Sequence, residues 1–165
     1  MIVLLPPSET KQQPGRGRPL DLSALSFPEL TATRAAVLSE LADVSGQPNA
    51  AAVLGVSPGL TEQIARNTRL GDLPTAPAGS VYTGVLYDAL GLSSLESDAR
   101  RRAARRLVVV SALFGALRIG DRIPAYRLAM GVSLPQAGKL GALWRGPLGQ
   151  VLPGVVGSGL IVDAR

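Results

Sequence analysis

The sequence predicts an α/β fold of the mixed α+β type, in which helices flank a central mixed sheet. Residues 2–5 and 107–110 are short, continuous apolar runs, and such runs are typical of strands that are covered on both faces. Segments with helical spacing and capping signals lie between the two runs. The length of 165 residues suits one domain, so we expect a single domain over residues 1–165.

The first predicted strand, residues 2–5, ends at two prolines and leads into a polar loop. Ligands of open α/β sheets bind at the carboxyl ends of the strands. Ser8, Thr10 and Lys11 are therefore placed where they could contact an anion, and an ordinary strand-exit loop is the alternative. Residues 12–20 are rich in Gly and Pro and are expected to form a mobile loop.

Three helices are predicted next. Residues 28–41 carry apolar side chains at helical spacing. Residues 49–54 and 61–67 form two short helices around a glycine turn, which resembles a helix-hairpin-helix. In that motif the hairpin amides hold a DNA phosphate, so Gly55 and Gly59 are candidate phosphate ligands. A plain helical hairpin is the alternative, because the turn itself lacks a basic residue, although arginines follow it.

The middle of the chain is rich in arginine. Residues 73–79 predict a Pro/Ala linker, and residues 81–87 fit either a strand or a helix. Ser94 is a good N-cap for a helix that carries five arginines. Arg101 and Arg105 lie four positions apart without a carboxylate to relieve their repulsion, which a polyanion would relieve. A solvated helix face is the alternative.

The most informative segment spans residues 106–131. A strand and a small-residue turn are followed by arginines inside an otherwise apolar run. The apolar flanks indicate a supported basic surface, and a guanidinium group suits phosphate or carboxylate. Arginines that are solvated or paired with Asp121 are the alternative. The candidate anion-binding residues of this segment are Arg118, Arg122, Tyr126 and Arg127.

The C-terminal part adds one aromatic candidate and one strand. Trp144 precedes Arg145 and could stack on a base, although a lone Trp is more often part of the core. Residues 160–163 predict a further strand.

Charge is distributed unevenly along the chain. Residues 1–99 carry a net charge of −4, and residues 100–165 carry a net charge of +9. This asymmetry favours an anionic partner, of which nucleic acid is the commonest. A compositional bias toward arginine is the alternative, since 15 of the 17 basic residues are Arg.

Composition also excludes several kinds of site. The chain has no Cys and no His, which excludes disulfides and removes the usual general base and the commonest metal ligand. There is no signal-peptide pattern and no apolar run of about 20 residues. We therefore expect a cytoplasmic protein with no membrane partner, and we predict no catalytic residue, cofactor or metal site.

Several stretches together resemble the bacterial peroxide stress protein YaaA family. They are IVLLPPSETK, VYTGVLYDAL, VVVSALFGALR, DRIPAYRLAMG, LWR and LIVDAR, which occur in this order. Family members are usually longer, so the resemblance implies a C-terminally shortened member that lacks the family's C-terminal third.

The resemblance implies a function and a site. The family protects against hydrogen peroxide by lowering free intracellular iron and by limiting oxidative damage to DNA and protein. Its members are similar to DNA-binding proteins and have a mixed α/β fold with a positively charged cleft and a helix-hairpin-helix element. The residues of matching motifs, implied as DNA contacts, are Lys11, Arg118, Tyr126 and Arg127.

Two functions follow from these observations. The first is a stress protein that binds DNA with weak sequence selectivity. The second is an enzyme that acts on a phosphorylated or nucleotide ligand in an Arg-lined pocket. Direct iron binding is disfavoured, because the carboxylates show no ligand spacing. The predicted DNA- or anion-binding residues are Lys11, Gly55, Gly59, Arg66, Arg101, Arg105, Arg118, Arg122, Tyr126 and Arg127.

Overall fold

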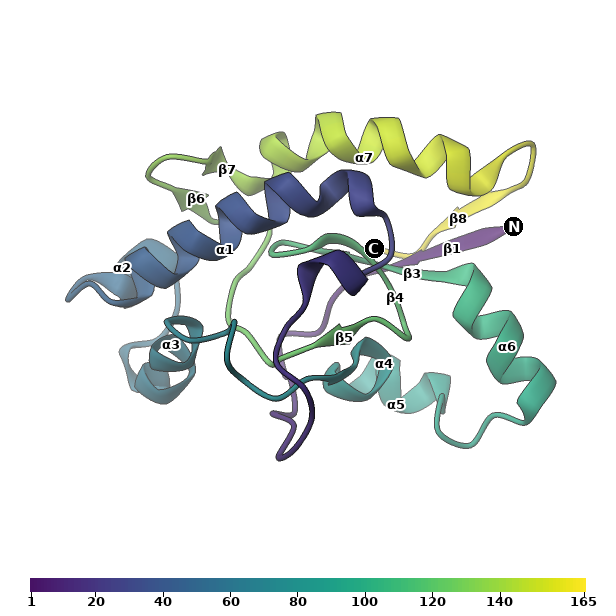
Figure 1. Ribbon diagram of the computed structural model, residues 1–165, viewed down its shortest axis with the longest axis horizontal. Coiled ribbons are helices and arrows are strands. Elements are labelled where there is room, and N and C mark those ends of the chain that lie inside the picture. The colour runs from purple at the N-terminus through teal and green to yellow at the C-terminus, as the bar shows by residue number, and fades with distance from the viewer.

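In the computed structural model, which describes residues 1–165, a four-stranded mixed sheet lies at the centre of the fold (Figure 1). Its strand order is β4-β3-β1-β8. β1 pairs in parallel with β3 and with β8, whereas β3 and β4 are antiparallel. The predicted fold class and the central place of the first strand are thus confirmed. The strands are β1 (Ile2–Leu5), β3 (Leu107–Ser111), β4 (Gly115–Arg118) and β8 (Ile161–Asp163).

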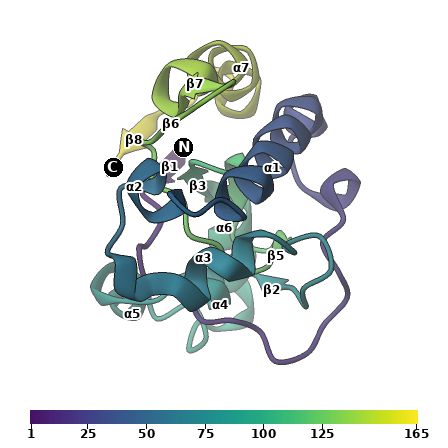
Figure 2. The same ribbon diagram turned by 90° about the vertical axis from the view of Figure 1, so that its left-hand side faces the viewer.

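Helices cover both sides of this sheet. Figure 2 shows α1 and α7 on one side of it, and α3, α4 and α5 on the other. None of the helices has the length and apolarity that crossing a membrane requires. The helices are α1 (Thr31–Ser45), α2 (Ala50–Leu54), α3 (Thr61–Asn67), α4 (Ala78–Val81), α5 (Val85–Leu90), α6 (Ser97–Arg106) and α7 (Leu140–Val156).

Two small antiparallel pairs complete the fold. β2 (Ala76–Pro77) pairs with β5 (Arg122–Ile123), and β6 (Ser133–Leu134) pairs with β7 (Gly138–Lys139). The linker predicted at residues 73–79 is therefore wrong, because this segment contains β2 and the start of α4. The backbone of residues 73–79 forms hydrogen bonds with the segment that follows β4.

Helix boundaries differ from the prediction at two places. α1 begins after a 3₁₀ turn at Pro28–Leu30 and runs to Ser45, beyond the predicted end at residue 41. The buried side chain of Val44 extends the apolar face of the helix by one more turn. Ser94 is not the N-cap of α6: its hydroxyl donates to the Gly91 carbonyl, and Glu96 occupies the N-cap position.

Residues 12–20 are fixed by hydrogen bonds, in contrast to the predicted mobile loop. The Leu20 amide donates to the Gly71 carbonyl, and both the amide and the hydroxyl of Thr75 donate to the Arg18 carbonyl. Composition suggested mobility, but these backbone groups find partners in residues 71–75.

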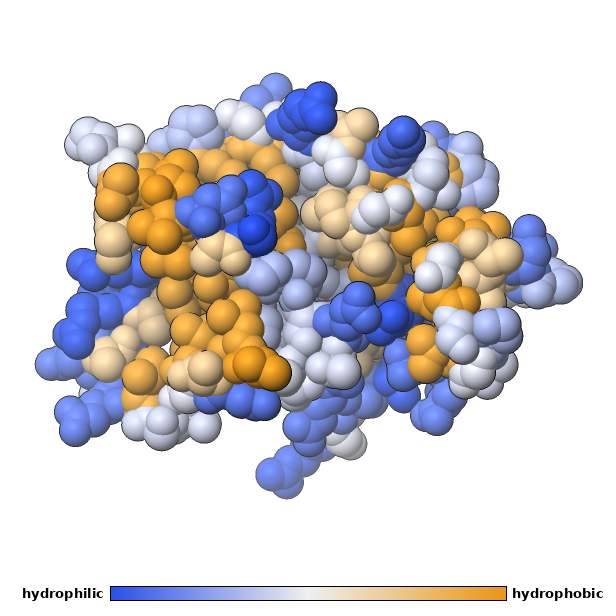
Figure 3. Space-filling view, turned by 180° about the vertical axis from the view of Figure 1, so that it is seen from behind, coloured by the Kyte–Doolittle hydropathy of each residue, from blue (hydrophilic) through white to orange (hydrophobic).

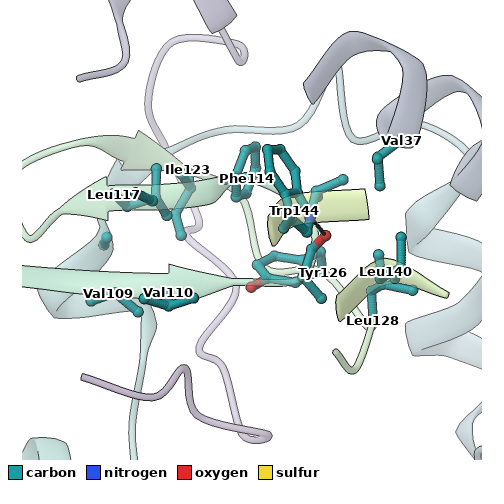
Figure 4. Close-up of a cluster of buried hydrophobic side chains, with 14 of the residues drawn as sticks. Val37, Val109, Val110, Phe114, Leu117, Ile123, Tyr126, Leu128, Leu140 and Trp144 are labelled. Atoms are coloured by element: carbon teal, nitrogen blue, oxygen red, sulfur yellow. Dashed lines mark hydrogen bonds between the residues drawn. The ribbon is translucent and has the colours of Figure 1, made fainter. Parts of the chain in front are cut away.

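The core contains one large aromatic cluster over the turn between β3 and β4. Trp144 is 1% exposed and donates from Nε1 to the Ala112 carbonyl at 2.8 Å, so Trp144 belongs to the core and cannot stack on a base. Its ring lies against Gly115, which has a φ of +71°. Figure 4 shows Phe114, Tyr126 and Trp144 together in this cluster.

A buried arginine joins α1 to the same turn. Arg34 is completely buried, and its guanidinium donates to the carbonyls of Phe114, Ala116 and Ser26 at 2.9, 2.7 and 2.7 Å. Burial lowers the pKa of Arg34 to about 10. The Arg34 guanidinium thus forms hydrogen bonds inside the protein and is not exposed to a binding partner.

One edge of the sheet is apolar and exposed. β8 pairs only with β1, so its other edge is open. Figure 3 shows hydrophobic side chains on the side of the molecule where β8 and the N-terminus lie. The large exposed apolar side chains there are Met1, Leu160, Ile161 and Val162.

Candidate anion-binding site

Three segments that are distant in sequence meet around a cavity of about 330 Å³. They are the loop after β1, the helix α3 and residues 125–127, which follow β5. The charged and aromatic side chains that line the cavity are Glu9, Lys11, Glu62, Arg66, Tyr126 and Arg127. Four of the residues predicted from the sequence, Lys11, Arg66, Tyr126 and Arg127, therefore lie together.

The backbone around Lys11 is held by the segment that links α4 and α5. Lys11 forms a β-bridge with Tyr82, and the neighbouring amide of Gln12 donates to the Val81 carbonyl at 2.9 Å. The Thr83 amide donates back to the Thr10 carbonyl. This pairing fixes the polar loop and directs the lysine side chain into the cavity.

The Lys11 ammonium group lies over two aromatic rings. Its Nζ is 4.4 Å from the centroid of the Tyr126 ring and 5.5 Å from that of Tyr82, which are cation–π distances. It donates one hydrogen bond, to the Ser8 carbonyl at 2.6 Å. Burial, together with the nearby charge of Arg127, lowers the pKa of Lys11 to about 8, whereas Glu9 opposes the shift.

A chain of buried hydroxyls holds the Tyr126 ring in place. The Tyr126 hydroxyl lies 2.7 Å from Ser111 Oγ and 2.9 Å from the Tyr82 hydroxyl. Burial raises the pKa of Tyr126 to about 12 and raises that of Tyr82 well above its usual value. Both phenols are therefore neutral near pH 7, and they support the lysine as polarizable rings rather than as anions.

The two arginines of the cavity have exposed carboxylate partners. Arg127 Nη2 lies 3.5 Å from Glu9 Oε2, and Arg66 Nη2 lies 3.1 Å from Glu62 Oε1. The arginine side chains are about one-fifth exposed, whereas those of Glu9 and Glu62 are 85% and 89% exposed. The guanidinium groups are thus held by the protein, while the carboxylates are free to turn away into solvent.

Asn67 positions Arg127 but was not identified from the sequence. It is completely buried at the end of α3, and its amide bonds both the N–H and the carbonyl of Arg127. The sequence contains one indication that Asn67 is buried: it lies three residues after Ile64 and therefore on the same, buried face of α3. Tyr82 was also missed, since the sequence left residues 81–87 open between strand and helix.

The other predicted arginines do not line this cavity. Arg118 lies with its guanidinium 5.4 Å from the Phe27 ring centroid and donates to the Arg105 carbonyl. Arg122 donates to the Thr75 carbonyl. Asp121 pairs with neither guanidinium; it accepts hydrogen bonds from Ser26 and from the Arg118 amide.

The arginine-rich helix α6 is far from the cavity. Figure 1 places α6 and α3 at opposite ends of the molecule. Arg101 is paired with Asp98 of the same helix, so the predicted repulsion is partly relieved, and Arg105 is exposed. The predicted arginines therefore form separate surfaces rather than one continuous trough.

The helical hairpin predicted from residues 49–67 is present. α2 and α3 are joined by a turn in which Gly55 has a φ of +64°, and a 3₁₀ turn at Pro58–Leu60 leads into α3. Both candidate amides already have partners in the hairpin: the Gly55 amide donates to the Ala52 carbonyl, and the Gly59 amide donates to Ser57 Oγ at 3.4 Å. Arg66 brings the hairpin's positive charge to the cavity.

No group of three or more His, Cys, Asp or Glu side chains that could hold a metal ion lies together in the chain. The cavity contains ammonium and guanidinium groups, hydroxyls and two carboxylates. This arrangement suits an anion that bears oxygen acceptors, such as a phosphate.

Comparison with known proteins identifies the family. A family model described as peroxide stress protein YaaA matches residues 1–165. A UPF0246 protein of Streptomyces coelicolor is 54% identical over 167 residues, and one of Corynebacterium efficiens is 45% identical over 169 residues. These alignments cover 100% of this chain but 64% and 66% of the relatives, so the chain spans less than two thirds of their length. The match over all of its residues shows that the chain belongs to the peroxide stress protein YaaA family.

Proposed function

We propose that this protein binds DNA through its phosphates, with weak sequence selectivity, and thereby limits damage by hydrogen peroxide. The observation that supports the proposal most directly is the meeting of Lys11, Arg66 and Arg127 around one cavity. These three cations come from separate segments and are held by hydrogen bonds and packing. Pre-positioned cations of this kind suit phosphate oxygens.

The two ion pairs of the cavity do not prevent phosphate binding. Ion pairs with an exposed partner contribute little to stability, about 0–1 kcal/mol. Glu9 and Glu62 are each more than four-fifths exposed, so a phosphate can take their place at the arginines. In this proposal the hairpin contacts the phosphate through the Arg66 side chain and not through the amides of Gly55 and Gly59.

The effect on oxidative damage is proposed as a consequence of DNA binding. In this proposal, protein bound along DNA keeps iron and peroxide away from the sugar-phosphate backbone. We expect the protein to protect plasmid DNA from nicking by ferrous ion and hydrogen peroxide. The double variant Arg66→Ala/Arg127→Ala should lose this protection, and equal protection by both proteins would contradict the link.

DNA binding itself is tested by gel-shift titration of duplex, branched and single-stranded DNA at two salt concentrations. The logarithm of the binding constant should fall with the logarithm of salt concentration by about 0.9 for each neutralised phosphate of a duplex. Arg66→Ala and Arg127→Ala should each reduce this slope by about 1. The matched control is Arg101→Ala/Arg105→Ala on α6. Salt-independent affinity, or a loss that is confined to the α6 variant, would contradict the proposal.

The size of the cavity supports a second candidate function. A volume of about 330 Å³ lies at the lower end of the range of about 300–1,000 Å³ that is usual for small-ligand pockets. An enzyme acting on a phosphorylated or nucleotide ligand would use the same cations. Arg118 lies outside the cavity and does not test this alternative. Under the alternative, Arg127→Ala should abolish binding of a small phosphorylated ligand, whereas under the first proposal it should only weaken DNA binding.

A further inference from the structure

The Lys11 amine has the surroundings of a nucleophile. It lines the cavity, and no carboxylate lies within ion-pair distance of its Nζ. Its neighbours are the two tyrosine rings and the Ser8 carbonyl. An amine attacks a carbonyl carbon only when it is neutral, and partial burial beside another cation favours the neutral form.

The lowered pKa makes the neutral amine accessible near physiological pH. With a pKa of about 8, roughly one-tenth of Lys11 is neutral at pH 7, compared with well under one-thousandth of an ordinary lysine. The second lysine of the chain, Lys139, is exposed and lies outside the cavity. The structure thus distinguishes one lysine from the other by its environment.

We propose that Lys11 forms an imine with an aldehyde or ketone that carries a phosphate, with Arg127 and Arg66 holding the phosphate. This inference rests on the anion-binding role proposed above and adds covalent chemistry to it. The cavity brings the three groups together: an amine that can attack, and two guanidinium groups that can orient the ligand through its phosphate.

The reaction is balanced without an oxidant or a reductant. The Nζ lone pair forms a bond to the carbonyl carbon while the carbonyl π electrons move to oxygen, which takes up a proton. The nitrogen then loses a proton and the hydroxyl leaves as water after protonation, so a C=N bond replaces the C=O bond. The overall conversion of ammonium and carbonyl to iminium and water conserves charge. Solvent, which reaches the cavity, can transfer these protons, and Glu9 and Glu62 are the carboxylates that line the cavity.

Two kinds of ligand carry a carbonyl group close to a phosphate. One is a small phosphorylated aldehyde or ketone. The other is DNA that has lost a base, because the exposed deoxyribose opens to an aldehyde beside a backbone phosphate. Both place a carbonyl carbon a few atoms from a phosphate, and the two arms of one experiment distinguish them.

The test is reductive trapping with sodium cyanoborohydride. One arm uses glyceraldehyde 3-phosphate, with glyceraldehyde as the control that lacks a phosphate, and the other uses a duplex with a single abasic site. Intact mass and peptide mapping are the readouts. In at least one arm we expect one adduct per chain, at Lys11, with at least tenfold less at Lys139. In the small-ligand arm, we expect adduct formation to depend on the phosphate.

Variants and pH separate this chemistry from chance labelling. Lys11→Arg keeps a positive charge but should abolish the adduct, whereas Lys139→Arg should leave it unchanged. Adduct formation in the wild type should reach half of its maximum near pH 8. Thermal unfolding of Lys11→Arg establishes that the variant is folded; if it is not, mapping of the wild-type adduct still decides between the two lysines.

Three outcomes would overturn the inference: equal labelling of Lys139 or of the N-terminal amine, an unchanged adduct in folded Lys11→Arg, or no adduct in either arm. Gel shifts of the wild-type protein on undamaged DNA are run in parallel. If the protein shifts DNA but is never trapped, the imine proposal is refuted and the proposed function stands. If the protein does not shift DNA, the proposed function is refuted, whatever the trapping shows.

Discussion

The side-chain amide of Asn67 binds both backbone polar groups of Arg127. Asn67 Nδ2 donates to the Arg127 carbonyl at 2.9 Å, and the Arg127 amide donates to Asn67 Oδ1 at 2.9 Å. A third bond, from Nδ2 to Ser45 Oγ at 3.2 Å, links the pair to α1. One buried amide therefore joins the helical hairpin to residues 125–127, which follow β5, and fixes the position of a cavity arginine.

Replacing Asn67 should weaken both the fold and the cavity. Asn67→Ala leaves the Arg127 backbone groups without partners, and we expect a loss of about 2 kcal/mol in the free energy of unfolding. We expect DNA affinity to fall roughly tenfold, as for the loss of one charge-assisted hydrogen bond. Chemical denaturation and gel shifts measure the two effects. The control is Asn49→Ala, since Asn49 is exposed and its side chain caps nothing; an equal effect at both positions would refute the role of Asn67.

Removing the cavity carboxylates should strengthen DNA binding. Glu9→Gln and Glu62→Gln each free an arginine from its ion pair and remove a like charge from the path of the phosphate. We expect a gain of about 1 kcal/mol or less for each substitution, because the pairs are exposed, and the gain should shrink at high salt. Titrations monitored by fluorescence anisotropy of labelled duplex measure it. Glu96→Gln, at the N-cap of α6, is the control, and a drop in affinity for the cavity variants would argue against this binding surface.

Lys11 should make stability rise with pH in the alkaline range. Its pKa is about 8 in the folded protein and 10.5 as the ordinary value, so the unfolded state binds more protons between these values. The free energy of unfolding gains on the order of 2 kcal/mol between about pH 8 and pH 10. Lys11→Met should lack this gain.

Urea denaturation of both proteins at several pH values tests this expectation. The comparison is limited to pH values below about 10, because the raised pKa values of the buried tyrosines lower stability at higher pH. Parallel curves for wild type and Lys11→Met would show that the folded state does not perturb the lysine.

Gly115 should not tolerate a side chain. Its φ is +71°, and an added Cβ would lie 2.5 Å from Cζ3 of Trp144. Gly115→Ala combines a left-handed backbone with overpacking, and we expect a loss of about 3 kcal/mol. Trp144 is the only tryptophan, so its fluorescence reports unfolding directly. Gly120→Ala, where no atom lies within 4 Å of an added Cβ, should change stability little; similar losses at both glycines would contradict the packing argument.

Local patterns were sufficient to predict much of the fold. The apolar run of residues 2–5 indicated a strand covered on both faces, and the structure places β1 inside the sheet. The helix predicted at residues 61–67 matches α3. These elements are determined by periodicity and by glycine or proline at their ends, which short windows of sequence contain.

The site depended on contacts that no short window contains. Lys11, Arg66 and Arg127 were each candidates, but only the fold shows that they share a cavity. Arg34 is charged on an apolar helix face, and its burial becomes intelligible only from the carbonyls at the β3–β4 turn. Arg118 and Arg122 have the same local pattern as Arg127, yet they bind backbone carbonyls elsewhere. Charge and flanking residues alone cannot separate these cases.

The position of β1 has a consequence for the synthesis of the chain. Leu4 leaves the ribosome about a hundred residues before its neighbour Val108, and its other neighbour, Asp163, follows later still. At a rate of about 5–20 residues per second, translation leaves this apolar strand without either neighbour for at least 5 s. The nascent chain therefore exposes this apolar strand to solvent until the segment that forms β3 has been made.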